Sequence, residues 1–230
     1  MNQLVAQAII LNRTNFGEAD RIITLLTPDS GKLRLIAKGV RKPKSRLAGG
    51  IELFSVSDIT YVRGRSELGT LTGARLDTHY SSIVLDVKRT MLGYELIKQL
   101  NKVTEDQPEP EYFKLLEQAF AALNDPTIAL PLIITWFNVG LIQQAGYAPN
   151  LHIDAGGSRL AENKRYNFSF DDMAFISSPE GRLDANHIKF LRLAFSGNSP
   201  KILSRISAET NLLSEVLPLT RTLVINHVQR

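Results

Sequence analysis

The sequence has no cysteine among its 230 residues. Disulfide bridges, thiolate nucleophiles and cysteine-ligated zinc sites are therefore excluded. Long apolar runs are also missing: the most apolar stretch, residues 128–145, is interrupted by a proline and three amide side chains, so we expect a buried helix and no membrane span. The N-terminus lacks the basic segment and small-residue cleavage site of a signal peptide, so we expect a cytoplasmic protein.

Linear signatures of catalysis are missing as well. The sequence has no phosphate-binding glycine loop, no H-E-x-x-H zinc motif, no G-x-S-x-G elbow and no calcium loop. The four histidines are scattered, and only His152 has a carboxylate, Asp154, at a ligand-like spacing, which is too few donors for a metal site. We therefore expect no catalytic residue, no metal and no cofactor, and we predict that the protein is not an enzyme.

Positive charge is concentrated in the first third of the chain. Residues 1–80 hold 12 Lys and Arg against 7 Asp and Glu, whereas the rest of the chain holds 15 against 16. Residues 30–50 contain no acidic residue at all. Such a localised excess is typical of a surface that binds a polyanion.

Seven of these cations lie within one stretch, residues 27–50. Residues 32–38 alternate between basic and apolar side chains, which predicts a strand with its bases on one face, and the stretch then becomes a loop with proline and glycine. The predicted phosphate contacts are Lys32, Arg34, Lys38, Arg41, Lys42, Lys44 and Arg46, with Arg63 and Arg65 as weaker candidates. The alternative is a solvated strand edge, because lysine and arginine also protect exposed strands from aggregation.

Two further residues have open roles. Arg21 either joins the basic stretch or pairs with Glu18 or Asp20. Tyr61 either stacks on a base or lies in the core, which is the commoner place for an aromatic residue in a strand.

Short β-branched and alternating runs predict five strands before residue 80, at residues 4–11, 21–27, 32–38, 54–63 and 67–76. Five short strands suit a small closed barrel of the oligonucleotide/oligosaccharide-binding (OB) type. We therefore expect an OB domain over residues 1–79.

Helical periodicity follows from residue 80 to residue 230. In the first helix the apolar face is predicted to contain Ile83, Val87, Met91, Tyr94, Ile97 and Leu100. Residues 126–145 are apolar nearly all round, and later helices begin at Asp184 and Pro200. Residues 147–182 are irregular and predict a small hairpin, so the fold class is α+β, a five-stranded OB barrel followed by an α-helical domain with a hairpin insertion.

Ordered motifs resemble the RecO family of DNA repair proteins across nearly the whole chain. The densest likeness is NFGEADRIITLLTPDSGKLRLIAKGVRKPKSRLAGGIELFS, with its T-x-x-x-G turn, A-K-G-x-R element and basic loop before a phenylalanine. Farther on, GLIQQAGYAPNL resembles the helix end and G-Y-x-P-x-L segment of that family.

The resemblance implies a nucleoid-associated recombination mediator in DNA repair. Such a protein binds single-stranded and double-stranded DNA, anneals complementary strands and helps to load a RecA-type recombinase. It also implies RecR as a partner and, for some members, RecF and the single-stranded DNA-binding protein. The alternative function is an OB-fold protein-interaction adaptor without tight intrinsic DNA binding.

The sequence departs from the family pattern where many members carry a four-cysteine zinc site. Residues 147–182 form a degenerate zinc-module-like segment that offers His152 and no cysteine, so we predict no zinc there. The segment either keeps the hairpin through packing of Tyr166, Phe168, Phe170 and Phe175, or is a flexible insertion.

Overall fold

The computed structural model describes residues 3–64, 67–105, 107–207 and 212–228. Packing divides the chain into two compact units, Met1–Asp125 and Pro126–Arg230, here called the N-terminal and C-terminal units. The expected domain boundary at residue 79 follows the change from strands to helices, whereas the packing division lies two helices later. Each unit is described by itself.

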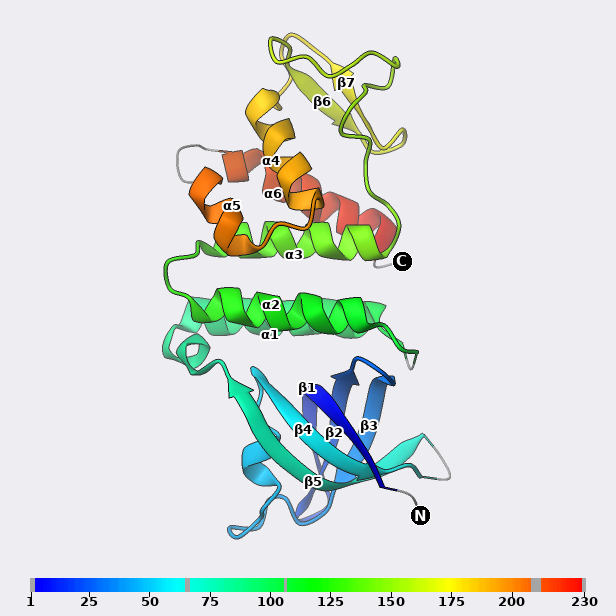
Figure 1. Ribbon diagram of the computed structural model, residues 1–230, viewed down its shortest axis with the longest axis vertical. Coiled ribbons are helices and arrows are strands. Elements are labelled where there is room, and N and C mark those ends of the chain that lie inside the picture. Colours follow the sequence, from blue (N-terminus) through cyan, green and yellow to red (C-terminus); the bar gives the residue numbers. More distant parts are fainter. Residues whose placement is uncertain (1–2, 65–66, 106, 208–211, 229–230) are drawn as a thin grey trace. The chain divides into compact units, whose positions relative to one another are not determined.

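The N-terminal unit contains a closed five-stranded barrel (Figure 1). Its strands are β1 Gln3–Phe16, β2 Asp20–Thr27, β3 Gly31–Ala37, β4 Ser55–Val62 and β5 Leu68–His79. They pair in the order β1-β2-β3-β5-β4, with β4 returning to β1, and only the β3–β5 contact is parallel among the pairings described. The expected five-stranded OB barrel is confirmed.

Alternation along the strands fills the inside of the barrel with apolar side chains. Leu35 and Ala37 from β3 meet Ile59 and Tyr61 from β4 in one buried cluster, as strand periodicity predicts for β3. Tyr61 is only 2% exposed. Base stacking by Tyr61 is therefore excluded, and its role is in the core.

Strand β1 runs five residues beyond the expected end at residue 11. The pairing with β2 shifts between Ile10 and Asn12 and then continues to the pair of Phe16 with Asp20. A bulge of this kind bends a strand and changes which side chains face inward. Sequence alternation is lost at that point, which explains why the strand was predicted too short.

Two helices, α1 Val87–Val103 and α2 Pro110–Asn124, complete the N-terminal unit, together with the short helices η1 Ala48–Gly50 and η2 Ser81–Leu85. Phe54 connects the barrel to both long helices: its ring makes edge-on contacts with Tyr94 at 5.2 Å and with Phe120 at 5.5 Å between ring centroids. A Cβ at Gly93 would lie 2.5 Å from the Phe54 ring, so α1 approaches this closely only because residue 93 is glycine.

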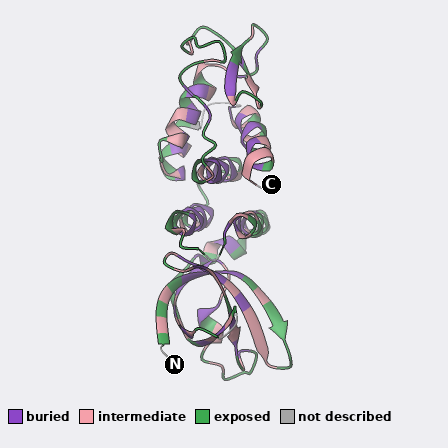
Figure 2. Cartoon of the chain, turned by 90° about the vertical axis from the view of Figure 1, so that its right-hand side faces the viewer, coloured by how far each residue is buried: buried purple, intermediate pink, exposed green. Residues whose placement is uncertain are grey.

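The predicted buried face of α1 is partly wrong. Ile97 and Leu100 are buried as expected, but Val87, Met91 and Tyr94 are 79%, 64% and 47% exposed. The helix is turned so that its glycine side meets the barrel, and this rotation leaves Val87 and Met91 largely in solvent. Ile83, which was expected on the same face, is buried but lies in η2, before α1 begins. Figure 2, which looks along the helices above the barrel, shows that they carry both buried and exposed residues.

The C-terminal unit is built around α3 Leu130–Gln144, which is buried on nearly every side, as its composition predicts. The other elements of the unit are α4 Ala185–Phe195, α5 Pro200–Ser207, α6 Leu212–Leu223, a π-helical turn η3 Val224–Val228, and the strands β6 Tyr166–Ser169 and β7 Ala174–Ser177. Gly146 ends α3 with a φ of 78°, the left-handed conformation typical of a helix C-terminus. Pro218 lies inside α6, and the regular helix ends five residues later.

The zinc-module-like segment forms the expected hairpin, β6 paired with β7. Its aromatic rings contact one another in series: Phe170 meets Phe168 and Phe168 meets Phe175, each at 5.3 Å, and Phe175 meets Tyr166 at 6.2 Å. Tyr166 and Phe175 are fully buried. The predicted aromatic packing is confirmed, and in the described residues no group of three or more His, Cys, Asp or Glu side chains is placed to hold a metal ion.

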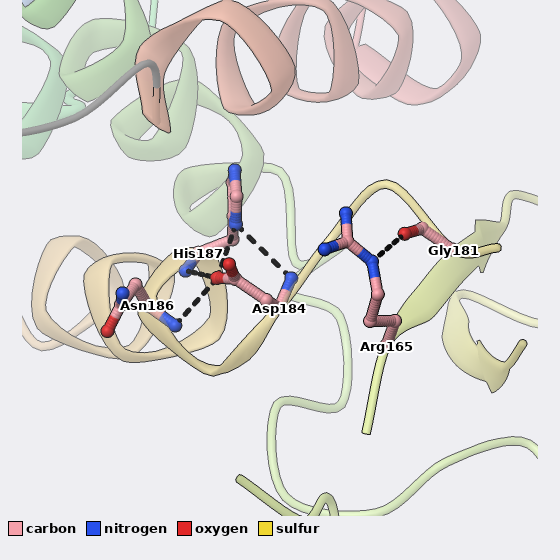
Figure 3. Close-up of polar contacts among 5 residues, drawn as sticks. All are labelled: Arg165, Gly181, Asp184, Asn186 and His187. Atoms are coloured by element: carbon pink, nitrogen blue, oxygen red, sulfur yellow. Dashed lines mark hydrogen bonds and ion pairs between the residues drawn. The ribbon is translucent and has the colours of Figure 1, made fainter. Parts of the chain in front are cut away.

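Asp184 caps α4, as predicted, and does so together with His187 (Figure 3). Its carboxylate accepts hydrogen bonds from the backbone N–H groups of Asn186 and His187, at 2.9 and 3.2 Å, and lies 2.7 Å from His187 Nδ1. Burial alone raises the pKa of Asp184, but the hydrogen bonds and charge of His187 outweigh it and lower that pKa below 3.8. Figure 3 also shows Arg165, the residue directly before β6, whose guanidinium donates a hydrogen bond to the Gly181 carbonyl. This contact, 2.5 Å long, ties the hairpin to the segment before α4.

Candidate nucleic-acid interface

Strand β3 presents its basic side chains on one face, because basic and apolar residues alternate along it. Leu35 and Ala37 point into the barrel, so Arg34 and Lys38 lie on the outward side, and both are exposed. Arg34 stands opposite Thr24 of β2 on one side and Leu68 of β5 on the other, so it is flanked by paired strands. Arg34 is therefore held on a rigid surface, and Lys38 stands directly after the strand, where the basic loop begins.

Lys32 shares their strand but has a different environment. Its Nζ donates to the carbonyl of Asn101, at 2.9 Å, and its backbone N–H donates to the Glu105 carbonyl, at 3.0 Å. A cation at a helix C-terminus is stabilised by the unpaired carbonyls and the helix dipole. The structure thus places Lys32 half-buried at the end of α1, away from the other lysines and arginines that were predicted to contact phosphates.

The basic loop, residues 38–47, connects β3 to η1 (light blue in Figure 1) and is a series of hydrogen-bonded turns. Gly39, at φ 64°, donates its N–H to Asp20 Oδ1 at 2.7 Å. The N–H of Arg41 donates to the Ala19 carbonyl at 2.9 Å, and its guanidinium donates to the Gly17 carbonyl at 3.3 Å. The loop is therefore anchored on the turn between β1 and β2.

The other end of the same connection is fixed by Gly50, where a Cβ would lie 2.5 Å from the backbone of Ala74 in β5. Lys38 precedes the first anchor, and Lys42, Lys44 and Arg46 lie between the two. All four cations are exposed and, in the part of the chain that the structure describes, make no ion pair. The nearby carboxylate of Glu18 is also exposed and bonds none of them. Cations without partners are free to meet phosphates.

The weaker candidates lie elsewhere on the barrel. Arg63 is exposed and lines a cavity of about 160 Å³ together with Arg34 and Glu67, where β3 and β5 pair in parallel. Arg65 lies outside the described residues. Arg21 donates to the side chain of Asn15 at 3.0 Å, a partner that differs from both alternatives drawn from the sequence.

One exposed aromatic residue in this region escaped the sequence analysis. Phe16 is 50% exposed, and it ends β1 immediately before the turn that anchors the basic loop. The sequence signal that could have revealed Phe16 is an aromatic residue followed by a glycine, which is typical of a strand end before a turn. It was not used because the first strand is predicted to end at residue 11. The described interface therefore combines rigid cations, a cationic loop and one aromatic side chain.

Comparison with known proteins matches both parts of the chain to one family. The family model described as Recombination protein O N terminal matches residues 1–80, and the one described as Recombination protein O C terminal matches residues 91–230. The chain belongs to the RecO family. The resemblance read from the sequence is confirmed, including for a member without cysteine.

Two relatives indicate how far the RecO likeness extends. DNA repair protein RecO of Dehalococcoides mccartyi is 31% identical over 219 residues, which are 91% of this chain and 85% of the relative. DNA repair protein RecO of Synechococcus elongatus is 37% identical over 150 residues, which are 63% of this chain and 55% of the relative. No helix in the described parts of this RecO family chain is long and apolar enough to cross a membrane.

Proposed function

We propose that this chain is a DNA-binding recombination mediator that binds single-stranded and double-stranded DNA, anneals complementary strands and helps to load a RecA-type recombinase. The observation that carries the proposal is the group of exposed, unpaired cations on the basic loop, anchored on an OB barrel. OB barrels bind single strands through a positively charged groove, and cations on a loop release counterions from phosphates.

The proposed activity involves no covalent chemistry. Annealing requires that two strands be brought together against their mutual repulsion, while their Watson-Crick edges remain free to pair. Cations on the outside of a barrel supply the first condition, because they neutralise phosphates and do not occupy the bases. The proposed phosphate contacts are Arg34, Lys38, Arg41, Lys42, Lys44, Arg46 and Arg63, without Lys32, whose ammonium is bonded to the end of α1.

The proposed partners follow from family membership. We propose RecR as a partner and, in addition, RecF and the single-stranded DNA-binding protein, in line with what the resemblance to the family implies. Family membership supports these partners as a group.

A second candidate function is an OB-fold adaptor that binds a protein and has no tight affinity for bare DNA. The exposed apolar residues of α1, Val87, Met91 and Tyr94, favour it, because exposed apolar patches mark protein contacts.

Binding of the isolated chain to a labelled bare single strand at about 0.15 M salt separates the two functions. A recombination mediator of the proposed kind binds the bare strand with an affinity that falls as salt rises, and it accelerates annealing of complementary strands. An adaptor shows neither effect without its partner.

A further inference from the structure

Phe16 lies on the same side of the sheet as the strand-borne cations. Residues directly opposite each other in antiparallel strands share a face, and Thr14 stands opposite Ile22, which stands opposite Ile36. Phe16 is two residues beyond Thr14, and Arg34 is two residues before Ile36, so both belong to this outward face. The ring and the guanidinium are thus presented by one continuous surface across β1, β2 and β3.

The basic loop begins beside the same ring. The residue that follows Phe16 is Gly17, whose carbonyl accepts the hydrogen bond of the Arg41 guanidinium at 3.3 Å. Asp20, the strand partner of Phe16, accepts the N–H of Gly39 at 2.7 Å. Both contacts fix the start of the loop against the tip of the β1–β2 hairpin, so its exposed cations extend from the neighbourhood of Phe16.

Phe16 differs from the other exposed aromatic residues of the described chain in its contacts. Two other aromatic side chains in the described regions are similarly exposed, and each contacts another ring: Tyr94 meets Phe54 at 5.2 Å and Tyr147 meets His227 at 4.9 Å. Phe16 makes no ring contact within the described residues. Half of the surface of this large apolar residue is therefore left in water, and a planar ligand would cover it favourably.

We propose that Phe16 stacks on an unpaired base of a single strand whose phosphates lie along the cations of residues 34–46, an inference that rests on the proposed DNA binding. Stacking on an aromatic ring uses the flat face of a base, which is available in a single strand and hidden in a duplex. Phe16 thereby gives this face a preference for single-stranded over double-stranded DNA. It also leaves the Watson-Crick edge of the stacked base free for annealing.

The test uses the full chain and two probes, a labelled single strand of thymidines and a labelled duplex of equal length. The variant Phe16→Ala is expected to weaken single-strand binding about tenfold, within the range for loss of one stacked base, and to leave duplex binding unchanged. The salt slope is expected to stay the same, because no cation is removed. The matched control, Leu85→Ala, removes an exposed apolar side chain from the same unit and is expected to change neither affinity.

Two further variants separate stacking from folding. Phe16→Leu keeps an apolar side chain without an aromatic face and is expected to lose as much single-strand affinity as Phe16→Ala. Phe16→Trp is expected to retain the affinity, and its indole fluorescence should be quenched on adding the single strand and not on adding the duplex. Retained affinity in Phe16→Leu, or equal losses on single strand and duplex, would overturn the inference.

The inference and the proposed function fail in different ways. If the wild-type chain binds the single strand with salt dependence and Phe16→Ala binds it equally well, stacking by Phe16 is wrong and the basic surface stands. If the wild-type chain itself does not bind the single strand, the proposed DNA binding is wrong, and the inference is overturned with it.

Discussion

Removing the three cations at the exposed centre of the basic loop should reduce both DNA affinity and its dependence on salt. The triple variant is Lys42→Ala, Lys44→Ala and Arg46→Ala. All three side chains are exposed, and none makes an ion pair within the described residues. Arg41 is left in place because its backbone and guanidinium hold the loop on the β1–β2 turn, so the loop keeps its shape.

The expected magnitude follows from counterion release. Each phosphate contact on a single strand contributes about 0.7 to the slope of log K against log salt, so three contacts contribute about 2. At about 0.15 M salt, relative to 1 M where this contribution vanishes, a slope change of that size corresponds to about a 50-fold loss of affinity. The loss should shrink as salt rises.

The assay is a titration of a labelled single strand at several salt concentrations, read by fluorescence anisotropy. The matched control removes three exposed lysines of α1 in the same unit, as Lys88→Ala, Lys98→Ala and Lys102→Ala. It changes the net charge equally, so an effect of overall charge would appear in both variants. We expect the control to keep nearly the wild-type slope.

Two results would refute this reasoning. An unchanged slope in the loop variant would mean that its cations do not meet phosphates. Equal changes in the loop variant and the α1 control would mean that DNA responds to the total charge of the unit, and that the basic loop is not a defined contact.

Three further variants test the structural basis of the account. Lys32→Met should lower the free energy of unfolding by about 1 kcal/mol, because it removes the cation at the end of α1, and should leave the salt slope of DNA binding unchanged. Gly31→Ala places a Cβ against the Gln107 carbonyl at a φ of 63° and should lower the free energy of unfolding in urea by about 3 kcal/mol. The control Gly17→Ala has a similar φ of 57° but no neighbour within 4 Å, so it should lower that free energy by only about 1 kcal/mol. Equal losses would contradict the close approach of Gly31 to Gln107. The folded-state pKa of Asp184 is lowered below 3.8, so its carboxylate stabilises the fold above that pH, and this stabilisation is lost as the pH falls through the lower folded value. Between about pH 5 and pH 2, Asp184→Asn should therefore lose less free energy of unfolding than the wild type. Parallel losses in the two proteins would contradict this stabilisation.

The barrel could be predicted from the sequence because its signals are local. Alternation in β3 places Leu35 and Ala37 inside and Arg34 outside, with Lys38 exposed directly after the strand, and the structure confirms both sides. The aromatic hairpin of the C-terminal unit could also be predicted from a local signal, because its four aromatic residues lie close together in the sequence. Such a cluster of rings can form the apolar core of a small module where a metal is missing.

What could not be predicted depends on contacts between distant residues. The side of α1 that is buried is set by the fit of Gly93 against Phe54, and periodicity alone does not distinguish that side from the stripe of Val87 and Met91. Lys32 has the same spacing as its basic neighbours, but a helix end some seventy residues later in the chain takes its ammonium. Phe16 was missed because the bulge in β1 ends the alternation before it.

The most direct test of the central claim is hydrogen-deuterium exchange of the full chain with and without a saturating single strand. The claim is that DNA lies on the outward face of β1, β2 and β3 and along the basic loop. Binding should slow exchange in residues 14–20 and 38–46 and leave the hairpin of β6 and β7 unchanged. Protection confined to the C-terminal unit, with no change in residues 38–46, would contradict the claim.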